Sequence, residues 1–148
     1  MNSTTEKFLD SAIKQQLAGN KKKALELYNK VLTESPDNLT ALVNQSAICM
    51  DLHNFADASN LLERALYISP NDIEALNNFG NTLISLGQLQ KAIEHFEFAH
   101  KLAPDNSTVS SNFGRALLRR GDYKKAINVF ESAIQYNPNN AGLRFVNA

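Results

Sequence analysis

Two arginines stand four residues apart near the end of the sequence, Arg115 and Arg119, with Arg120 beside the second. On a helix this spacing places the first two guanidinium groups on one face. Each guanidinium presents a planar fork of N–H donors, so two on one face can clamp a carboxylate or a phosphate. The pattern predicts a site for an acidic group. The alternative is a solvated face that binds no ligand.

Asparagines offer a second kind of chemistry. Asn44, Asn78 and Asn112 are each 34 residues apart, and Asp10 stands one such interval before Asn44. A side-chain amide both donates and accepts, so it can pair with a peptide backbone of any sequence. Amides at a constant interval therefore predict a ladder for an extended peptide. The alternative is a column of amides with only a structural role.

The residues that commonly perform catalysis are not arranged for it here. His53, His95 and His100 show no ligand spacing, and no acidic residue or cysteine accompanies them on one face. The single cysteine, Cys49, has no histidine placed to activate it and cannot form an internal disulfide. No glycine-rich phosphate loop, pair of catalytic carboxylates or metal motif is present in the sequence. We expect a non-catalytic protein with no cofactor and no metal.

Composition argues against two further classes. Lys and Arg number 15, and so do Asp and Glu, which gives a net charge of zero. A general nucleic-acid binder would need a basic excess to displace counterions. The apolar runs are too short for a membrane span, and the start lacks the pattern of a secretory signal. We expect no nucleic-acid partner, no membrane and a cytoplasmic location.

The interval that separates the asparagines also separates the prolines. Pro36, Pro70, Pro104 and Pro138 are each 34 residues apart, and the sequence has no others. Because proline cannot continue a helix interior, this interval marks one structural unit used four times. Each block contains two stretches with apolar residues at steps of three and four, joined by a turn that carries glycine in three blocks and His53 in the other. We predict helices near 4–18, 21–34, 38–52, 55–68, 72–86, 89–102, 106–120 and 123–136.

Small and bulky residues recur at fixed positions within the blocks. The eighth position of each block holds Ala12, Ser46, Gly80 and Gly114. The twentieth holds Ala24, Ala58, Ala92 and Ala126, and the twenty-fourth holds Tyr28, Leu62, Phe96 and Phe130. Bulky side chains that face small ones let two helices approach closely at native density. We expect the core at positions four, seven, eight and eleven of each first helix.

The order of these features resembles the tetratricopeptide repeat. The likeness is plainest in Asn112-Phe113-Gly114, in the stretch from Gly121 to Ile127, and in Pro138. The resemblance implies an all-α fold: a right-handed superhelical solenoid of antiparallel helix pairs. In such a solenoid the first helices of the pairs line a concave groove.

The resemblance divides the chain into four repeats with short ends. We expect an N-terminal extension at 1–4, repeats at 5–38, 39–72, 73–106 and 107–140, and at 141–148 a short C-terminal helix or the start of a further repeat.

The resemblance also implies a protein–protein interaction scaffold that binds a peptide or protein segment in the groove. By the helix period, the groove face presents Asn44, Asn77, Asn78, Asn81 and Asn112, together with Arg115 and Arg119. Acidic residues on this face, Glu6, Asp10, Asp51 and Glu74, belong to the first three blocks. We therefore expect the arginines to meet an acidic part of the ligand.

Two alternatives remain open. The asparagine column is similar to the ladder of the repeat domain in O-linked N-acetylglucosamine transferases, so the chain could be the non-catalytic repeat portion of a larger enzyme such as a glycosyltransferase. It could also be a self-assembling scaffold that forms a homo-oligomer through its C-terminal end. There Leu143, Phe145 and Val146 are apolar but do not follow the repeat pattern.

Overall fold

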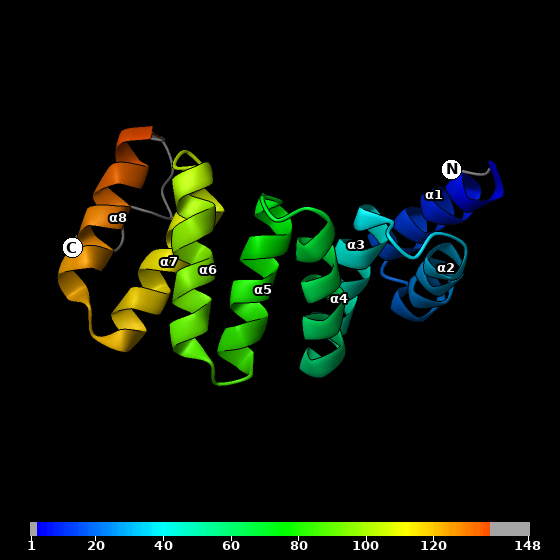
Figure 1. The fold of residues 1–148 in the computed structure, drawn as a ribbon, viewed down its shortest axis with the longest axis horizontal. Coiled ribbons are helices and arrows are strands. Elements are labelled where there is room, and N and C mark those ends of the chain that lie inside the picture. The colour runs from blue at the N-terminus through cyan, green and yellow to red at the C-terminus, as the bar shows by residue number, and fades with distance from the viewer. Residues whose placement is uncertain (1–2, 137–148) are drawn as a thin grey trace. The chain divides into compact units, whose positions relative to one another are not determined.

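A computed structural model describes residues 3–136, and the regular elements of this part of the chain are all α-helices (Figure 1). They are α1 (Ser3–Leu17), α2 (Lys21–Glu34), α3 (Leu39–Asp51), α4 (Phe55–Ile68), α5 (Ile73–Ser85), α6 (Leu89–Leu102), α7 (Ser107–Arg120) and α8 (Tyr123–Tyr136). Each bound lies within one residue of the sequence prediction, so the predicted all-α fold of helix pairs is confirmed. The predictions for Pro138 and for 141–148, Leu143, Phe145 and Val146 included, lie outside the described residues.

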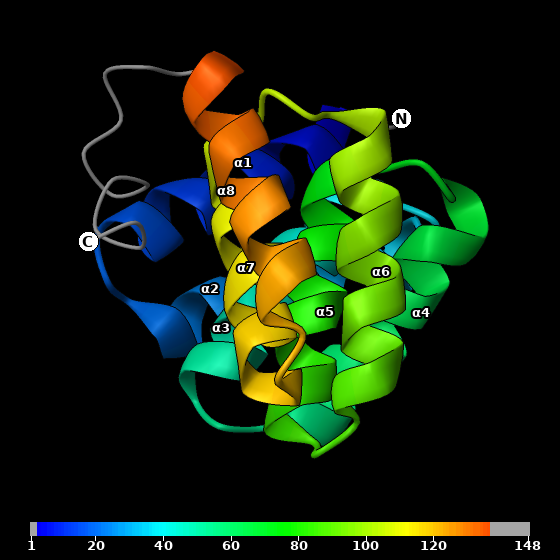
Figure 2. The ribbon, with the colours of Figure 1, turned by 90° about the vertical axis from the view of Figure 1, so that its left-hand side faces the viewer.

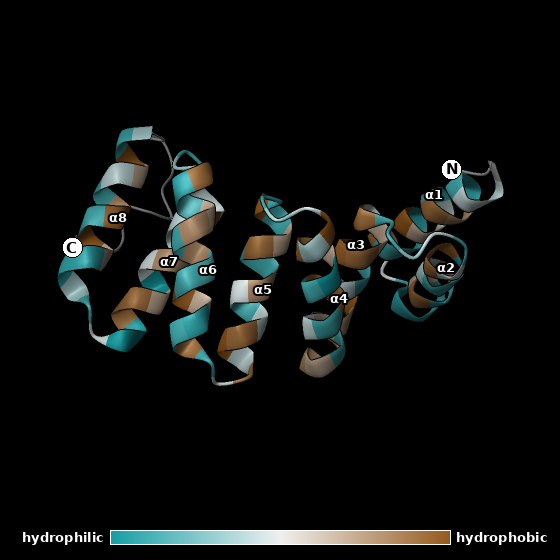
Figure 3. Cartoon of the chain, in the orientation of Figure 1, coloured by the Kyte–Doolittle hydropathy of each residue, from teal (hydrophilic) through white to brown (hydrophobic). Residues whose placement is uncertain are grey.

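The described chain divides into two units between Asn78 and Phe79, within α5. In the first unit, α1 packs on α2, α3 packs on α4, and α2 packs on α3. In the second, α6 packs on α7, and α7 packs on α8 (Figure 1, Figure 2). Hydrophilic and hydrophobic residues alternate along each helix with the pattern of an amphipathic helix (Figure 3).

The small and bulky positions predicted from the sequence form the core of both units. All residues at the eighth, twentieth and twenty-fourth positions are buried. A Cβ built on Gly80 would lie 2.5 Å from Cε1 of Phe96, and one built on Gly114 would overlap the ring of Phe130. The rings therefore occupy the space that a side chain on the first helix would need, which is why glycine stands at these two close approaches.

The turns within the pairs require a left-handed residue. Gly19, Gly87 and Gly121 have φ values of 78°, 76° and 87°. His53, which replaces glycine in the second block, has the same kind of backbone with φ of 59°. An L-residue pays about 1–2 kcal/mol of steric energy in this region, so the second turn stores strain that the glycine turns avoid.

Side-chain caps from the Asn or Asp residue two positions after the preceding proline begin α3, α5 and α7. The side chain of Asn38 accepts a hydrogen bond from the Ala41 N–H at 2.9 Å, and that of Asp72 accepts from the Ala75 N–H at 2.8 Å. Asn106 caps α7 in the same way. Since the caps and the prolines recur together, each first helix begins at nearly the same place in its block.

The core of the first helices is wider than predicted. Positions three and ten are also buried in the last three blocks, with Ala41 and Ile48 on α3 as examples. Val43, which stands outside the predicted core positions, is also buried, with a side chain only 5% exposed. The reason is that α3 packs against α1 and α2 as well as α4, so more than one of its faces is covered.

Candidate protein-interaction surface

The predicted amides lie on the first helices and are half-buried. Asn44 lies on α3 and Asn77 and Asn78 on α5 in the first unit, whereas Asn81 and Asn112 lie in the second unit. Asn77, Asn78 and Asn112 already take part in interactions within the chain. A ligand that binds these amides would therefore have to exchange with or add to internal contacts.

The buried Tyr28 of α2 interacts with Asn44 of α3. The Tyr28 hydroxyl donates to Oε1 of Gln16 at 2.6 Å. Burial raises the pKa of Tyr28, and a hydrogen bond with Asn44 lowers that pKa in part.

Arg115 and Arg119 form the exposed cationic pair that their spacing predicted. Both are exposed on α7, and neither has an ion-pair partner among residues 3–136. Asn112 stands three residues before Arg115, so one face of α7 presents an amide and two guanidinium groups. This face can donate hydrogen bonds to a peptide carbonyl and to a carboxylate.

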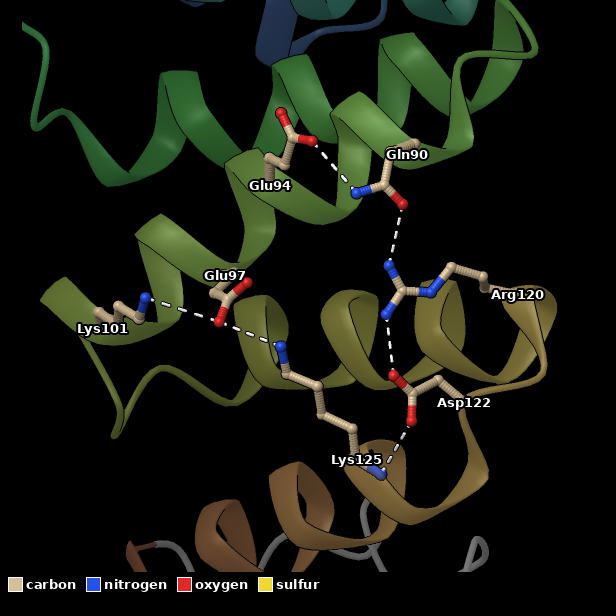
Figure 4. A network of polar contacts seen from close by, with 7 residues as sticks. All are labelled: Gln90, Glu94, Glu97, Lys101, Arg120, Asp122 and Lys125. Carbon is tan, nitrogen blue, oxygen red and sulfur yellow. Dashed lines mark hydrogen bonds and ion pairs between the residues drawn. The ribbon is translucent and has the colours of Figure 1, made fainter.

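Arg120 does not belong to this pair. Its Nη1 donates to Oε1 of Gln90 at 2.9 Å, and its Nη2 pairs with Oδ2 of Asp122 at 2.8 Å. Gln90 in turn donates to Glu94 on the same helix (Figure 4). Arg120 therefore joins α6 to the turn before α8, a role that its position in the sequence did not indicate.

A second row of contacts in Figure 4 neutralises Glu97. The ammonium groups of Lys125 and Lys101 lie 3.1 Å and 3.5 Å from Oε1 of Glu97. The hydrogen bond from Lys125 is the main reason that the pKa of Glu97 is lowered. The backbone N–H of Lys125 also donates to Asp122 at 3.4 Å, so both rows meet at the start of α8.

The acidic side of the predicted charge gradient is weaker than the sequence indicated. Asp51 pairs with Lys21 at 2.9 Å and so joins the end of α3 to the start of α2. Glu6, Asp10 and Glu74 are exposed. Lys21 also lines a cleft of about 610 Å3 at the start of α2, together with Gln15, Asn20, Lys22, Lys23 and Glu26.

Gln45 stands at position seven of its block, where the core was predicted, although its side chain is polar. Its side chain is 9% exposed, and its Nε2 donates to Oδ1 of Asn29 at 2.8 Å. Its Oε1 is buried without a hydrogen-bond partner among the described residues. The second unit has Phe79 and Phe113 at this position of the block, whereas the first block has Ser11. The column therefore gave no signal for such a buried amide oxygen.

The histidines of the second unit and Cys49 have packing roles. His95 lies 4.8 Å from the Phe79 ring, and Nδ1 of His100 lies 3.0 Å from the Ser110 hydroxyl. Burial lowers the pKa of both histidines. Burial also raises the pKa of the Cys49 thiol, and the charge of Asp57 adds to this, so the reactive thiolate is disfavoured.

No group of three or more His, Cys, Asp and Glu side chains among residues 3–136 lies close enough to hold a metal ion. No described helix is long and apolar enough to span a membrane.

Comparisons with known proteins give the following likenesses. A family model for the tetratricopeptide repeat matches residues 37–105 and 71–138. A MamA protein of known structure is 23% identical, with a TM-score of 0.85, over 99% of this chain and 82% of that one. YrrB, described as a TPR protein with an unusual peptide-binding site, is 19% identical, with a TM-score of 0.80, over 94% of this chain and 72% of that one.

A third structure is an enzyme. An O-GlcNAc transferase of Thermobaculum terrenum is 29% identical, with a TM-score of 0.73, over 78% of this chain but only 22% of the transferase. No curated protein sequence matches this chain significantly.

Proposed function

Because the chain belongs to the tetratricopeptide repeat family, we propose that it is an interaction protein that binds an extended segment of another protein and catalyses no reaction. The segment binds on the face of the first helices, and we assign repeats at 5–38, 39–72, 73–106 and 107–140. The observation that carries this proposal is the face of α7. It presents Asn112, Arg115 and Arg119 to solvent on one helical side, and the two arginines have no ion-pair partner in the described part of the chain.

The chemistry of this face suits an acidic ligand. The guanidinium groups bind a side-chain or terminal carboxylate through paired N–H donors. The amides of Asn44, Asn77, Asn78, Asn81 and Asn112 pair with the ligand backbone, which makes the affinity depend little on the other ligand side chains. Exposed ion pairs are worth about 0.2–1 kcal/mol each, so we expect weak binding that salt diminishes.

The test uses a fluorescein-labelled peptide of repeated Glu-Gly-Ser triplets and fluorescence polarisation. Replacing both Arg115→Gln and Arg119→Gln should weaken binding by about twofold to tenfold and flatten its salt dependence. Lys124→Gln is the matched control, because Lys124 is an exposed cation of the same unit on another helix. Equal affinity in the wild type and the double variant would contradict the proposal.

A second candidate is the non-catalytic repeat portion of a larger glycosyltransferase. The likeness to the transferase at 29% identity favours it, although the match covers only 22% of that enzyme. An immunoblot of the source cells with an antibody to this chain measures the size of the native protein. A native band at the size of the 148-residue chain would exclude this candidate.

A third candidate is self-association through the C-terminal end. On α8, Tyr123 is 65% exposed and Ile127 is 43% exposed, although both lie at positions that are apolar in three of the four blocks. Light scattering over a range of concentrations should then show a dimer that Ile127→Asp abolishes. A mass that stays at the monomer value throughout would refute it.

A further inference from the structure

A second surface with different chemistry lies on α4. Five residues on one side of this helix and Asp37 from the loop before α3 line a cleft of about 420 Å3, and the five are Asn60, Glu63, Arg64, Tyr67 and Ile68. They follow one another at steps of three and four, and the buried side of α4 is formed by other residues, such as Ala58 and Leu62. The cleft therefore belongs to the exposed side of a second helix, whereas the amides and arginines lie on first helices.

The cleft contains an aromatic side chain that makes little contact with its own protein. Tyr67 is 90% exposed, and Ile68 beside it is 38% exposed. A tyrosine ring offers apolar area and a face that attracts cations, and it loses little conformational entropy when a ligand covers it. Tyr67 thus has the properties of an anchor for an incoming side chain.

The carboxylates around Tyr67 lack the lysine that the next pair of helices supplies. One repeat interval later, Glu97 stands where Glu63 stands, and Lys101 stands where Tyr67 stands. There the lysine pairs with the glutamate at 3.5 Å. On α4 the tyrosine cannot do this, and Glu63 accepts only a 3.3 Å bond from Ser59 among the described residues.

The local charge is net negative. Residues 39–72 contain four acidic residues and only one basic residue, Arg64. The Arg64 guanidinium donates to the carbonyl oxygen of Pro36 at 2.7 Å. Asp37 adds a further exposed carboxylate at the edge of the cleft.

We infer that this cleft docks a basic segment of a partner protein, with a Lys or Arg side chain laid over the Tyr67 ring. Its cationic group supplies the partner that Glu63 lacks and reaches Asp37 across the cleft. Ile68 covers the apolar stem of the same side chain. The binding is independent of the acidic ligand proposed for α7, because it uses another helix and the opposite charge.

The experiment titrates the full chain with a fluorescein-labelled peptide of repeated Arg-Gly-Ser triplets. In NMR spectra of the protein, the backbone amide chemical shifts of Asn60, Glu63 and Tyr67 and of their neighbours should change when the peptide is added. Glu63→Gln and Tyr67→Ala should each weaken binding by about twofold to fivefold, and the two together by about tenfold. Tyr67→Lys introduces the residue type that stands one repeat interval later, at Lys101. It should weaken binding at least as much as Tyr67→Ala, because the new lysine can form an ion pair with Glu63 within the same helix.

Glu131→Gln is the matched control, because Glu131 stands two repeat intervals after Glu63 and is exposed on α8. It should change the affinity by less than about twofold. The inference is overturned if the peptide does not bind, if its shifts map to another surface, or if the α4 variants bind it as the wild type does. The acidic peptide serves as an independent readout: it should bind these α4 variants normally, so a failure of either site is seen separately.

Discussion

The fit between Gly114 and Phe130 predicts how a single methyl group should affect stability. In Gly114→Ala the new Cβ would overlap three ring atoms of Phe130, namely Cζ, Cε1 and Cε2. The ring is only 1% exposed, so it has no solvent-side space into which to move. Either the ring leaves its preferred rotamer or α7 moves away from α8.

The magnitude follows from two opposed effects. Overpacking a core costs about 1–3 kcal/mol, and the complete burial of the ring favours the upper part of this range. Alanine gains about 1 kcal/mol over glycine in a helix interior. We therefore expect the free energy of unfolding to fall by about 1–2 kcal/mol, measured by urea denaturation with far-UV circular dichroism.

A double-mutant cycle separates the steric effect from other causes. Phe130→Leu removes the ring atoms and alone should cost about 1–2 kcal/mol through lost packing. With leucine present, Gly114→Ala should become neutral or stabilising, so the coupling energy should be at least about 1 kcal/mol. The second helix pair already has such a combination, with Ser46 and Leu62 at these positions. Additive effects, or a Gly114→Ala protein as stable as the wild type, would refute the steric reasoning.

Three further predictions concern other sites. His53→Gly should raise the free energy of unfolding by about 1 kcal/mol, because glycine relieves the left-handed backbone at φ 59°; Gly87→Ala should lower it, and equal thermal midpoints would count against the strain. Gln45→Met should stabilise the chain by up to about 1 kcal/mol in urea, because it removes a buried acceptor without a partner; a large loss would mean that the bond to Asn29 matters more. Burial lowers the folded-state pKa of His95 and His100 from 6.5, so their stabilising contribution is present above that value and is lost as the pH falls through the lowered pKa; urea midpoints should drop between about pH 7 and about pH 5, and less so in His95→Gln with His100→Gln.

The helices could be predicted from the sequence because the interactions that begin and end them involve residues close together in the chain. The prolines, the caps such as Asn38 and the turn glycines act within a few residues, and the steps of three and four act within one helix. The pairing of Gly80 with Phe96 could be predicted as well, because it joins two neighbouring helices at a constant interval.

The sequence predicted the environment of a site residue only where its side chain has no partner on another helix. Arg115 and Arg119 are exposed as their spacing indicated. Arg120 is also an arginine and directly follows Arg119, yet its guanidinium group binds Gln90, which is 30 residues earlier in the sequence. Long side chains reach partners that depend on how helices are arranged in space, and no period in the sequence encodes such a partner.

The burial of Val43 has the same cause. One period describes one packed face, whereas α3 is flanked by α1, α2 and α4. Gln45 stands in a column that holds Phe79 and Phe113 in the last two blocks, and its side-chain oxygen has no hydrogen-bond partner among the described residues. The burial of Val43 and the environment of the Gln45 oxygen could be predicted only from the relative positions of several helices.

The contacts between Gly80 and Phe96 and between Gly114 and Phe130 join the first helix of a block to the second helix of the same block. Both partners are therefore carried by one stretch of coding sequence shorter than a single repeat. A gene duplication or recombination event that exchanges whole blocks keeps each ring with its matching glycine. A crossover inside a block could instead place Phe130 opposite Ser46 or Leu62 opposite Gly114, which creates a clash or a void. Selection on packing alone would then favour inheritance by whole blocks, and the shared 34-residue interval of the prolines is consistent with that history.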